Sequence, residues 1–177
     1  LTDMQTVIKK YGKLVEDIME YIRLGNHPGI EVRDNGLLYA PGGQDRALTW
    51  MNSQANGKPI VPRSGYIVEV NALWYNCLMF SAEICRVMKD EPVEQMLLEA
   101  AEKTKAGFLE VFMNQHGYLL DYVDGNMMDW SVRPNMIFPV AFDYSPLDQK
   151  QKKVILDLCT KELLTPKGLR SLSPKSG

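Results

Sequence analysis

Val68-Glu69-Val70-Asn71-Ala72-Leu73-Trp74-Tyr75-Asn76 opens the most apolar part of a 177-residue chain. The apolar residues continue to residue 88 and surround a predicted helix over 67–88, which implies burial on most of its faces. Glu69 and Asn71 lie in its first turn, two positions apart and therefore on different faces. A carboxyl buried there must be paired, hydrogen-bonded or shifted in pKa. Glu69 is thus a candidate acid or base, although a first-turn glutamate is equally a common partner of the helix dipole.

Upstream of this helix the sequence predicts one more helix and a long connection. Apolar residues spaced by three and four predict a helix over 3–24. Thr2 and Gln5 have capping-box spacing, and Gly25 suits the position after the last turn. Residues 26–67 are rich in Gly, Pro, Asn and Asp and predict a connection without a long helix.

The connection contains two short extended pieces. They are predicted at Ile30–Val32 and Leu37–Tyr39, on either side of the turn signal Asp34-Asn35-Gly36. A connection of about forty residues is unusual in a compact domain, and long connections of this kind tend to be functional.

Downstream, Asp90 predicts the N-cap of a third helix with Pro92 in its first turn, and His116-Gly117 predicts its end. Tyr118–Tyr122 then predicts a short extended segment before a turn at Asp124-Gly125-Asn126.

The remaining residues predict two more helices. A shorter fourth helix is expected from Pro134, and a fifth from Ser145-Pro146 to about Leu164. Antiparallel helical neighbours joined by loops predict an all-α toroid or bundle. The length suits one globular domain, or part of a larger one, over residues 1–177.

The charge balance disfavours nucleic acid and anionic membranes as partners. The 20 basic residues are interleaved with 22 acidic ones, for a net charge of −2. No run approaches the roughly 18 uncharged apolar residues of a spanning helix, and the N-terminus lacks a signal-peptide pattern. We therefore expect a soluble, cytoplasmic protein.

The three cysteines lack metal-ligand spacing and lie among apolar residues, which predicts reduced core thiols at Cys77, Cys85 and Cys159. His27 and His116 are interpreted as turn residues. Because the sequence contains neither a metal-ligand cluster nor a phosphate loop, we expect no metal and no cofactor.

Trp50 and Arg63 lie near the end of the long connection. An indole in a Gly- and Pro-rich loop can stack on the C–H face of a pyranose ring, or it can close the end of a helical core. Arg63, restrained by Pro62, can present its guanidinium to sugar hydroxyls or a carboxylate, or lie on the surface as an ordinary arginine.

A second polar group occurs in Asp129-Trp130-Ser131-Val132-Arg133-Pro134-Asn135. Pro134 restrains Arg133 away from helical geometry. Asp129, Arg133 and Asn135 are therefore candidates to converge on one polar pocket, and a structural Asp129–Arg133 pair is the alternative.

Several runs resemble the glucosidase region of glycogen debranching enzymes. The family has a Thr-Trp-Met-Asp run, a Pro-Arg and a Val-Glu-x-Asn-Ala-Leu-Trp-Tyr-Asn run in this order. It also has a Gly-Leu-Leu segment, an Arg-Pro-Asn-Gln run and a Leu-Leu-Thr-Pro-x-Gly-Leu-Arg-Thr-Leu run. The matching residues are 36–38, 49–52, 62–63, 68–76, 133–135 and 163–172.

The resemblance implies an (α/α)6 toroid related to glucoamylases, which removes α-1,6-linked glucose from glycogen or limit dextrin with inversion. Five helices are about half of such a toroid, so we expect a fragment of a longer enzyme. We also expect the chain to be inactive alone and its exposed apolar face to be covered by another copy or a rearranged segment.

An inverting glycosidase needs a protonated carboxyl and a carboxylate that activates water. The resemblance puts the acid at Asn52, whose carboxamide cannot give and recover a proton, and the second carboxylate beyond Gly177. Another carboxyl, Glu69 first or Asp129 second, is one explanation; a binding protein that has lost hydrolysis and an engineered substitution are the others. The predicted substrate-binding residues are Trp50, Asn52, Arg63, Glu69, Asn71, Trp74, Tyr75, Arg133 and Asn135.

A helical interaction module without a sugar site is the alternative from another class. It predicts that the aromatic residues Trp50, Trp74, Tyr75 and Trp130 are buried, and that Arg63, Glu69 and Arg133 reach solvent or form unconnected pairs. The glycosidase interpretation predicts that Trp50, Arg63, Glu69 and Arg133 line one concavity.

Overall fold

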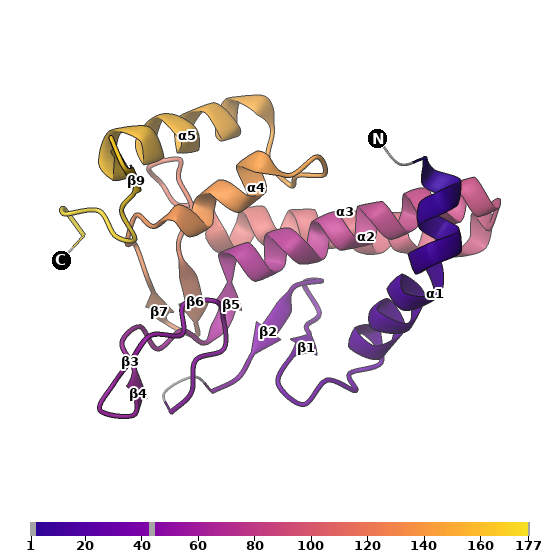
Figure 1. Ribbon diagram of the computed structural model, residues 1–177, viewed down its shortest axis with the longest axis horizontal. Coiled ribbons are helices and arrows are strands. Elements are labelled where there is room, and N and C mark those ends of the chain that lie inside the picture. Colours follow the sequence, from indigo (N-terminus) through magenta and orange to yellow (C-terminus); the bar gives the residue numbers. More distant parts are fainter. Residues whose placement is uncertain (1–2, 43–44, 177) are drawn as a thin grey trace.

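The computed structural model describes residues 3–42 and 45–176. Two long antiparallel helices, α2 (Val68–Met88) and α3 (Glu91–Phe112), run side by side through the molecule (Figure 1). The helices α1 (Met4–Arg23) and α5 (Gln149–Leu163) lie at opposite ends of this pair, with η1 (Pro134–Ile137) and α4 (Phe138–Ala141) on the α5 side. The helices fill two apolar cores, one between α1, α2 and α3 and the other between α2, α3, η1 and α5.

The all-α prediction is wrong in one respect, because a five-stranded antiparallel sheet lies at the N-terminal end of α2. Its order is β1-β2-β5-β6-β7, and two further hairpins, β3-β4 and β8-β9, stand apart from it. Long connections that pass over a core must pair their backbone groups, and here they pair with one another. The strands are β1 (Glu31–Val32), β2 (Leu38–Ala40), β3 (Gln54–Ala55), β4 (Lys58–Pro59), β5 (Gly65–Ile67), β6 (Tyr122–Asp124), β7 (Met127–Met128), β8 (Leu164–Thr165) and β9 (Gly168–Leu169).

Helix α1 and the first hairpin follow the sequence closely. Asp3 caps α1 by accepting a hydrogen bond from the Thr6 backbone N–H at 2.9 Å, whereas the predicted cap, Thr2, lies outside the described residues. Gly25 follows the last turn with a φ of 69°, as predicted. The predicted turn at 34–36 joins β1 to β2.

Three predicted boundaries differ. Helix α3 ends at Phe112 instead of His116-Gly117, because the Asn114 side chain accepts from the backbone N–H of His116 and turns the chain. Helix α5 begins after its capping residue Asp148, not at Ser145-Pro146. The extended segment predicted at 118–122 lies mainly at 122–124, in β6.

Close backbone approaches place the sheet against the helices. Gly65, with a φ of 78°, leads into β5, and a Cβ there would meet the Val123 oxygen of β6. A Cβ on Gly107 of α3 would meet the Asn35 oxygen in the turn before β2. Among the described residues, no helix has both the length and the apolar character needed to cross a bilayer.

Candidate functional site

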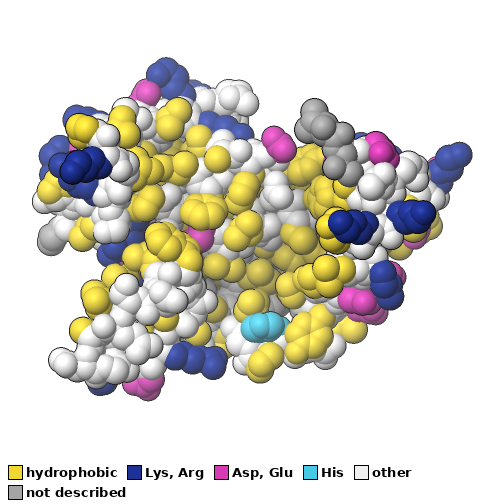
Figure 2. Space-filling view, in the orientation of Figure 1, with side chains coloured by type: hydrophobic (Ala, Val, Ile, Leu, Met, Phe, Trp, Pro, Cys, Tyr) yellow, Lys and Arg dark blue, Asp and Glu magenta, His cyan; other side chains and the backbone are white. Residues whose placement is uncertain are grey.

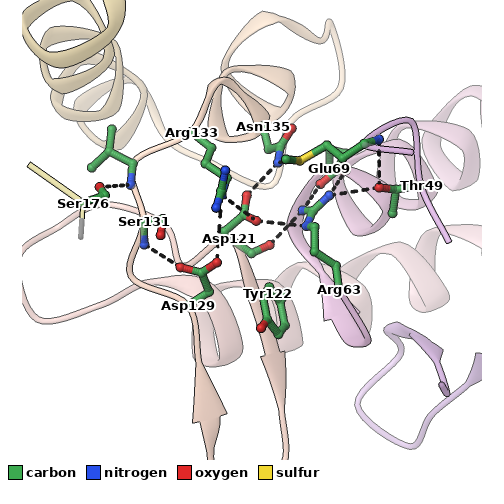
Figure 3. Close-up of polar contacts among 12 residues, drawn as sticks. Thr49, Arg63, Glu69, Asp121, Tyr122, Asp129, Ser131, Arg133, Asn135 and Ser176 are labelled. Atoms are coloured by element: carbon green, nitrogen blue, oxygen red, sulfur yellow. Dashed lines mark hydrogen bonds and ion pairs between the residues drawn. The ribbon is translucent and has the colours of Figure 1, made fainter. Parts of the chain in front are cut away.

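A buried ion pair joins the loop before β5 to the first turn of α2. Arg63 binds Glu69 with two hydrogen bonds, Nη1 to Oε1 at 2.5 Å and Nη2 to Oε2 at 2.6 Å (Figure 3). Both residues are only 2% exposed. This is the fork geometry that a guanidinium and a carboxylate favour. Glu69 therefore has a partner on each oxygen, and the pairing that burial requires is met by Arg63.

Asp121 lies beside this pair, directly before β6, and is 1% exposed. Its Oδ2 is 2.9 Å from Arg63 Nε, an ion pair not aligned as a hydrogen bond. Its backbone oxygen accepts from Arg63 Nη2 at 3.2 Å and from the Val68 N–H at 3.1 Å. Asp121 thus joins β6, the loop before β5 and the start of α2.

The two central charges affect each other's titration. Burial raises the pKa of Asp121 to about 6; the Arg63 charge and the Asn135 hydrogen bond oppose the rise, and the Glu69 charge adds to it. Burial lowers the pKa of Arg63, but its hydrogen bond to Glu69 and the Asp121 charge outweigh this, so the pKa is raised overall. The guanidinium therefore stays charged, whereas Asp121 changes charge at about pH 6.

Asp129 and Arg133 occupy the neighbouring positions, at the base of the β6–β7 hairpin. Arg133 Nε is 3.6 Å from Asp121 Oδ2 and 3.9 Å from Asp129 Oδ2, so it lies between the two carboxylates (Figure 3). Arg133 has extended backbone before Pro134, as predicted. The Oδ1 atom of Asp129 accepts from the Ser131 N–H at 2.8 Å.

Trp50 reaches this network through Asn135. Its Nε1 donates to Asn135 Oδ1 at 3.1 Å, and Asn135 Nδ2 donates to Asp121 Oδ1 at 2.7 Å. A second hydrogen bond ties the loop that carries Trp50 to the network: Arg63 Nη1 donates to Thr49 Oγ1 at 3.3 Å. Trp50 as a whole residue is 55% exposed. One polar network therefore connects segments 85 residues apart in the chain.

The other predicted site residues lie elsewhere. Asn71 is buried and bonds the backbone of Leu38 at both its amide nitrogen and oxygen. Trp74 and Tyr75 are buried in the core between α1, α2 and α3, and Trp74 Nε1 donates to the Gly36 oxygen. Asn52 is exposed, just before the β3–β4 hairpin. The structure thus groups Trp50, Arg63, Glu69, Asp129, Arg133 and Asn135, and it places Asn71, Trp74 and Tyr75 in packing positions.

The sequence profile of amylo-alpha-1,6-glucosidase matches residues 1–177, the whole chain. The chain belongs to the amylo-alpha-1,6-glucosidase family. A search of curated proteins returned no match.

The family match supports the predicted relation to the glucosidase region of glycogen debranching enzymes. It covers both segments that the polar network joins, the loop at 49–63 and the hairpin base at 121–135.

Sequence reasoning missed Asp121. Its signal was present, because a lone carboxylate follows the apolar pair Leu119-Leu120 and precedes an aromatic residue. An acidic residue in such a run is buried only when it has partners. Its partners come from three different segments, so no spacing along the chain identifies it.

The described residues offer no group of three or more His, Cys, Asp or Glu side chains arranged to hold a metal ion. The network consists of two arginines, three carboxylates and an amide, which suits hydrogen bonding to a hydroxyl-rich ligand. A hollow of about 350 Å³ lies beside the first hairpin and is lined by His27, Arg46 and Ile67 among others. Trp50, Arg63, Glu69 and Arg133, which were predicted to line one concavity, are not among its lining residues.

Proposed function

We propose that the chain forms the substrate-binding part of an α-1,6-glucosidase site that takes the terminal glucose of a branched α-glucan. The link from Trp50 through Asn135 to Asp121 carries this proposal. It presents an exposed indole face next to buried charged groups, and sugar sites combine an aromatic platform with hydrogen-bonding groups. Membership of the amylo-alpha-1,6-glucosidase family supports the choice of ligand.

The charged groups divide into two roles in this proposal. Glu69 is a positioning group, because Arg63 occupies both of its oxygens. Arg133 and Asp129 are less deeply buried than Arg63 and Glu69, and they bind sugar hydroxyls. A guanidinium between two carboxylates is suited to a diol, which both donates and accepts hydrogen bonds.

The 177-residue chain is expected to bind but not to hydrolyse. General acid catalysis of glycosidic cleavage needs a protonated carboxyl at the leaving oxygen, and Asn52 has a carboxamide at the position where the family resemblance puts that acid. Complete catalysis would proceed with inversion, on a site completed as an (α/α)6 toroid. The α2–α3 hairpin is one antiparallel pair of the kind from which such a toroid is built.

Binding and catalysis are tested separately. Titration of the chain with a dextrin carrying a single α-1,6-linked glucose should show binding that Trp50→Ala abolishes and that the control Trp130→Ala leaves in place. Binding that survives Trp50→Ala contradicts the proposed site. Glucose release should be undetectable from the chain with Asn52, and glucose that is released after Asn52→Asp should appear first as the β anomer, the product of inversion.

A helical interaction module is the second candidate function, favoured by the outer face of α1. Tyr11, Leu14, Ile18 and Tyr21 form a stripe at helical spacing and are 45–57% exposed. The opposite face of α1 covers an apolar groove of about 620 Å³ between α1, α2 and α3, lined by Met19, Trp74 and Leu78 among others. In Figure 2, apolar side chains on the α1 side of the molecule are interspersed with charged ones.

The partner we propose for this stripe is α1 of a second copy. The first half of α1 carries Lys9, Lys10 and Lys13, and the second half carries Glu16, Asp17 and Glu20 together with Arg23; Lys13 also pairs with Glu16 and Asp17 of its own helix. Antiparallel pairing of two copies therefore sets opposite charges against each other. Light scattering should give a dimer that Leu14→Glu/Ile18→Glu converts to a folded monomer, with Lys150→Glu as a control. A wild-type monomer at high concentration contradicts this candidate.

A further inference from the structure

The Asn135 amide is enclosed between a carboxylate and an indole. Asn135 is fully buried in η1. Its Nδ2 donates to Asp121 Oδ1 at 2.7 Å and to the Met51 sulfur at 3.2 Å, and its Oδ1 accepts from Trp50 Nε1 at 3.1 Å. Figure 3 shows the Asn135 side chain directed toward Asp121. One small side chain thus links a buried charge to an exposed aromatic ring.

The direction of this amide follows from its two neighbours. An ionised carboxylate only accepts hydrogen bonds, and an indole N–H only donates them. The amide must therefore turn its NH₂ toward Asp121 and its carbonyl oxygen toward Trp50. A flipped amide would set oxygen against oxygen and N–H against N–H, which costs two hydrogen bonds at a buried position.

The Trp50 ring depends on this amide for its orientation. Trp50 is more than half exposed as a residue, so packing alone restrains its ring weakly. The rest of its loop is tied at Thr49, whose Oγ1 accepts from Arg63 and from the Met51 N–H at 3.2 Å. Arg63 therefore holds the loop at Thr49, and Asn135 holds the Trp50 ring. Both Arg63 and Asn135 belong to the same polar network.

We infer that Asn135 and Asp121 are positioning residues that hold the Trp50 indole as a stacking platform for a glucosyl ring. The inference rests on the proposed function for its ligand, but the hydrogen-bonded relay does not. Holding the ring before the sugar arrives removes an ordering cost from binding. Asp121 acts through Asn135 and does not itself touch the sugar.

The relay is tested without any sugar, by the indole N–H resonances of the ¹⁵N-labelled chain at pH 7.5, where Asp121 is ionised. The Trp50 signal is assigned by its loss in Trp50→Phe. Asn135→Ala and Asp121→Asn should move this signal and speed its exchange with water, and the Trp74 and Trp130 signals should stay. The matched control is Asp124→Asn, three residues away in the same hairpin and bonded to Tyr39 and Ser64. A Trp50 signal unchanged by Asn135→Ala overturns the relay.

The platform is tested by affinity for the same dextrin with one α-1,6-linked glucose. Asn135→Ala should weaken binding about three- to tenfold, which is the worth of one hydrogen bond. In a Trp50→Phe background the same change should have no further effect, because the relay then has no indole to hold. An equal loss in both backgrounds means that Asn135 contacts the sugar directly and overturns the positioning role.

Failure of the proposed function can be distinguished from failure of the relay. A wild-type chain that binds no dextrin refutes the proposed function, while the resonance experiment still decides the relay. Thermal unfolding of each variant shows whether it is folded. If Asp121→Asn does not fold, Asn135→Ala and Trp50→Phe decide both points without it.

Discussion

Arg63→Met is the substitution from which we expect the largest loss of stability. Arg63 is 2% exposed and is the shared cation of two carboxylates, with two hydrogen bonds to Glu69 and an ion pair to Asp121. Methionine has a similar length and no charge, so the change leaves both carboxylates buried with one cation fewer. The loss therefore reflects uncompensated charge more than lost volume.

The magnitude follows from the pairing. Removing one partner of a buried ion pair costs about 3–5 kcal/mol, a large part of the 5–15 kcal/mol by which domains are stable. For a chain of this length each kcal/mol lowers the midpoint of thermal unfolding by about 2–4 °C, so we expect a fall of about 6–20 °C. Circular dichroism at 222 nm during heating measures it.

Lys153→Met is the matched control. Lys153 also pairs with a carboxylate, Asp157 at 2.8 Å, but the two side chains are 75% and 65% exposed. Water screens such a pair, and we expect a change within about 1 kcal/mol. Adding Glu69→Gln to Arg63→Met should cost less than the sum of the two single changes, because the partners share one interaction. Equal midpoints for Arg63→Met and Lys153→Met would refute the reasoning.

Three more predictions concern other parts of the molecule. Because burial raises the pKa of Asp121 from its ordinary 3.8 to about 6, the folded chain binds an extra proton between these values. Stability should therefore fall by up to about 3 kcal/mol as pH rises from 4 through 6, and Asp121→Asn should remove that slope in urea unfolding. Gly107→Ala should lower stability by about 1–3 kcal/mol, since its Cβ would meet backbone of the turn before β2. By contrast, Gly12→Ala in α1 makes only ordinary contact and should raise stability by about 0.5–1 kcal/mol, and equal midpoints for the pair would contradict this. Burial raises the pKa of the Cys159 thiol to about 11, so iodoacetamide at pH 8 should alkylate Cys85 well before Cys159, as read by peptide mass spectrometry.

Local pattern predicted the helices well because their hydrogen bonds form within one segment. The apolar spacing over 3–24 and the apolar run over 67–88 correspond to α1 and α2 within a residue or two. The turn signal at 34–36 predicted the first hairpin for the same reason. The predicted end of α3 was wrong, because the Asn114 side chain bonds the His116 N–H and closes a turn there. The spacing of apolar residues gives no sign of such a side-chain hydrogen bond.

The sequence by itself determined the helical elements and the family, since both depend on residue order along the chain. Tertiary structure alone decided the sheet, because β5 pairs with strands on both sides that come from distant segments. Tertiary structure also separates two tryptophans that the sequence treated alike. Trp74 is buried in a core, whereas Trp50 is exposed and bonded to the polar network. The importance of Asp121 arises in the same way, because burial and the charges of Arg63, Glu69 and Asp129 meet only in the folded chain.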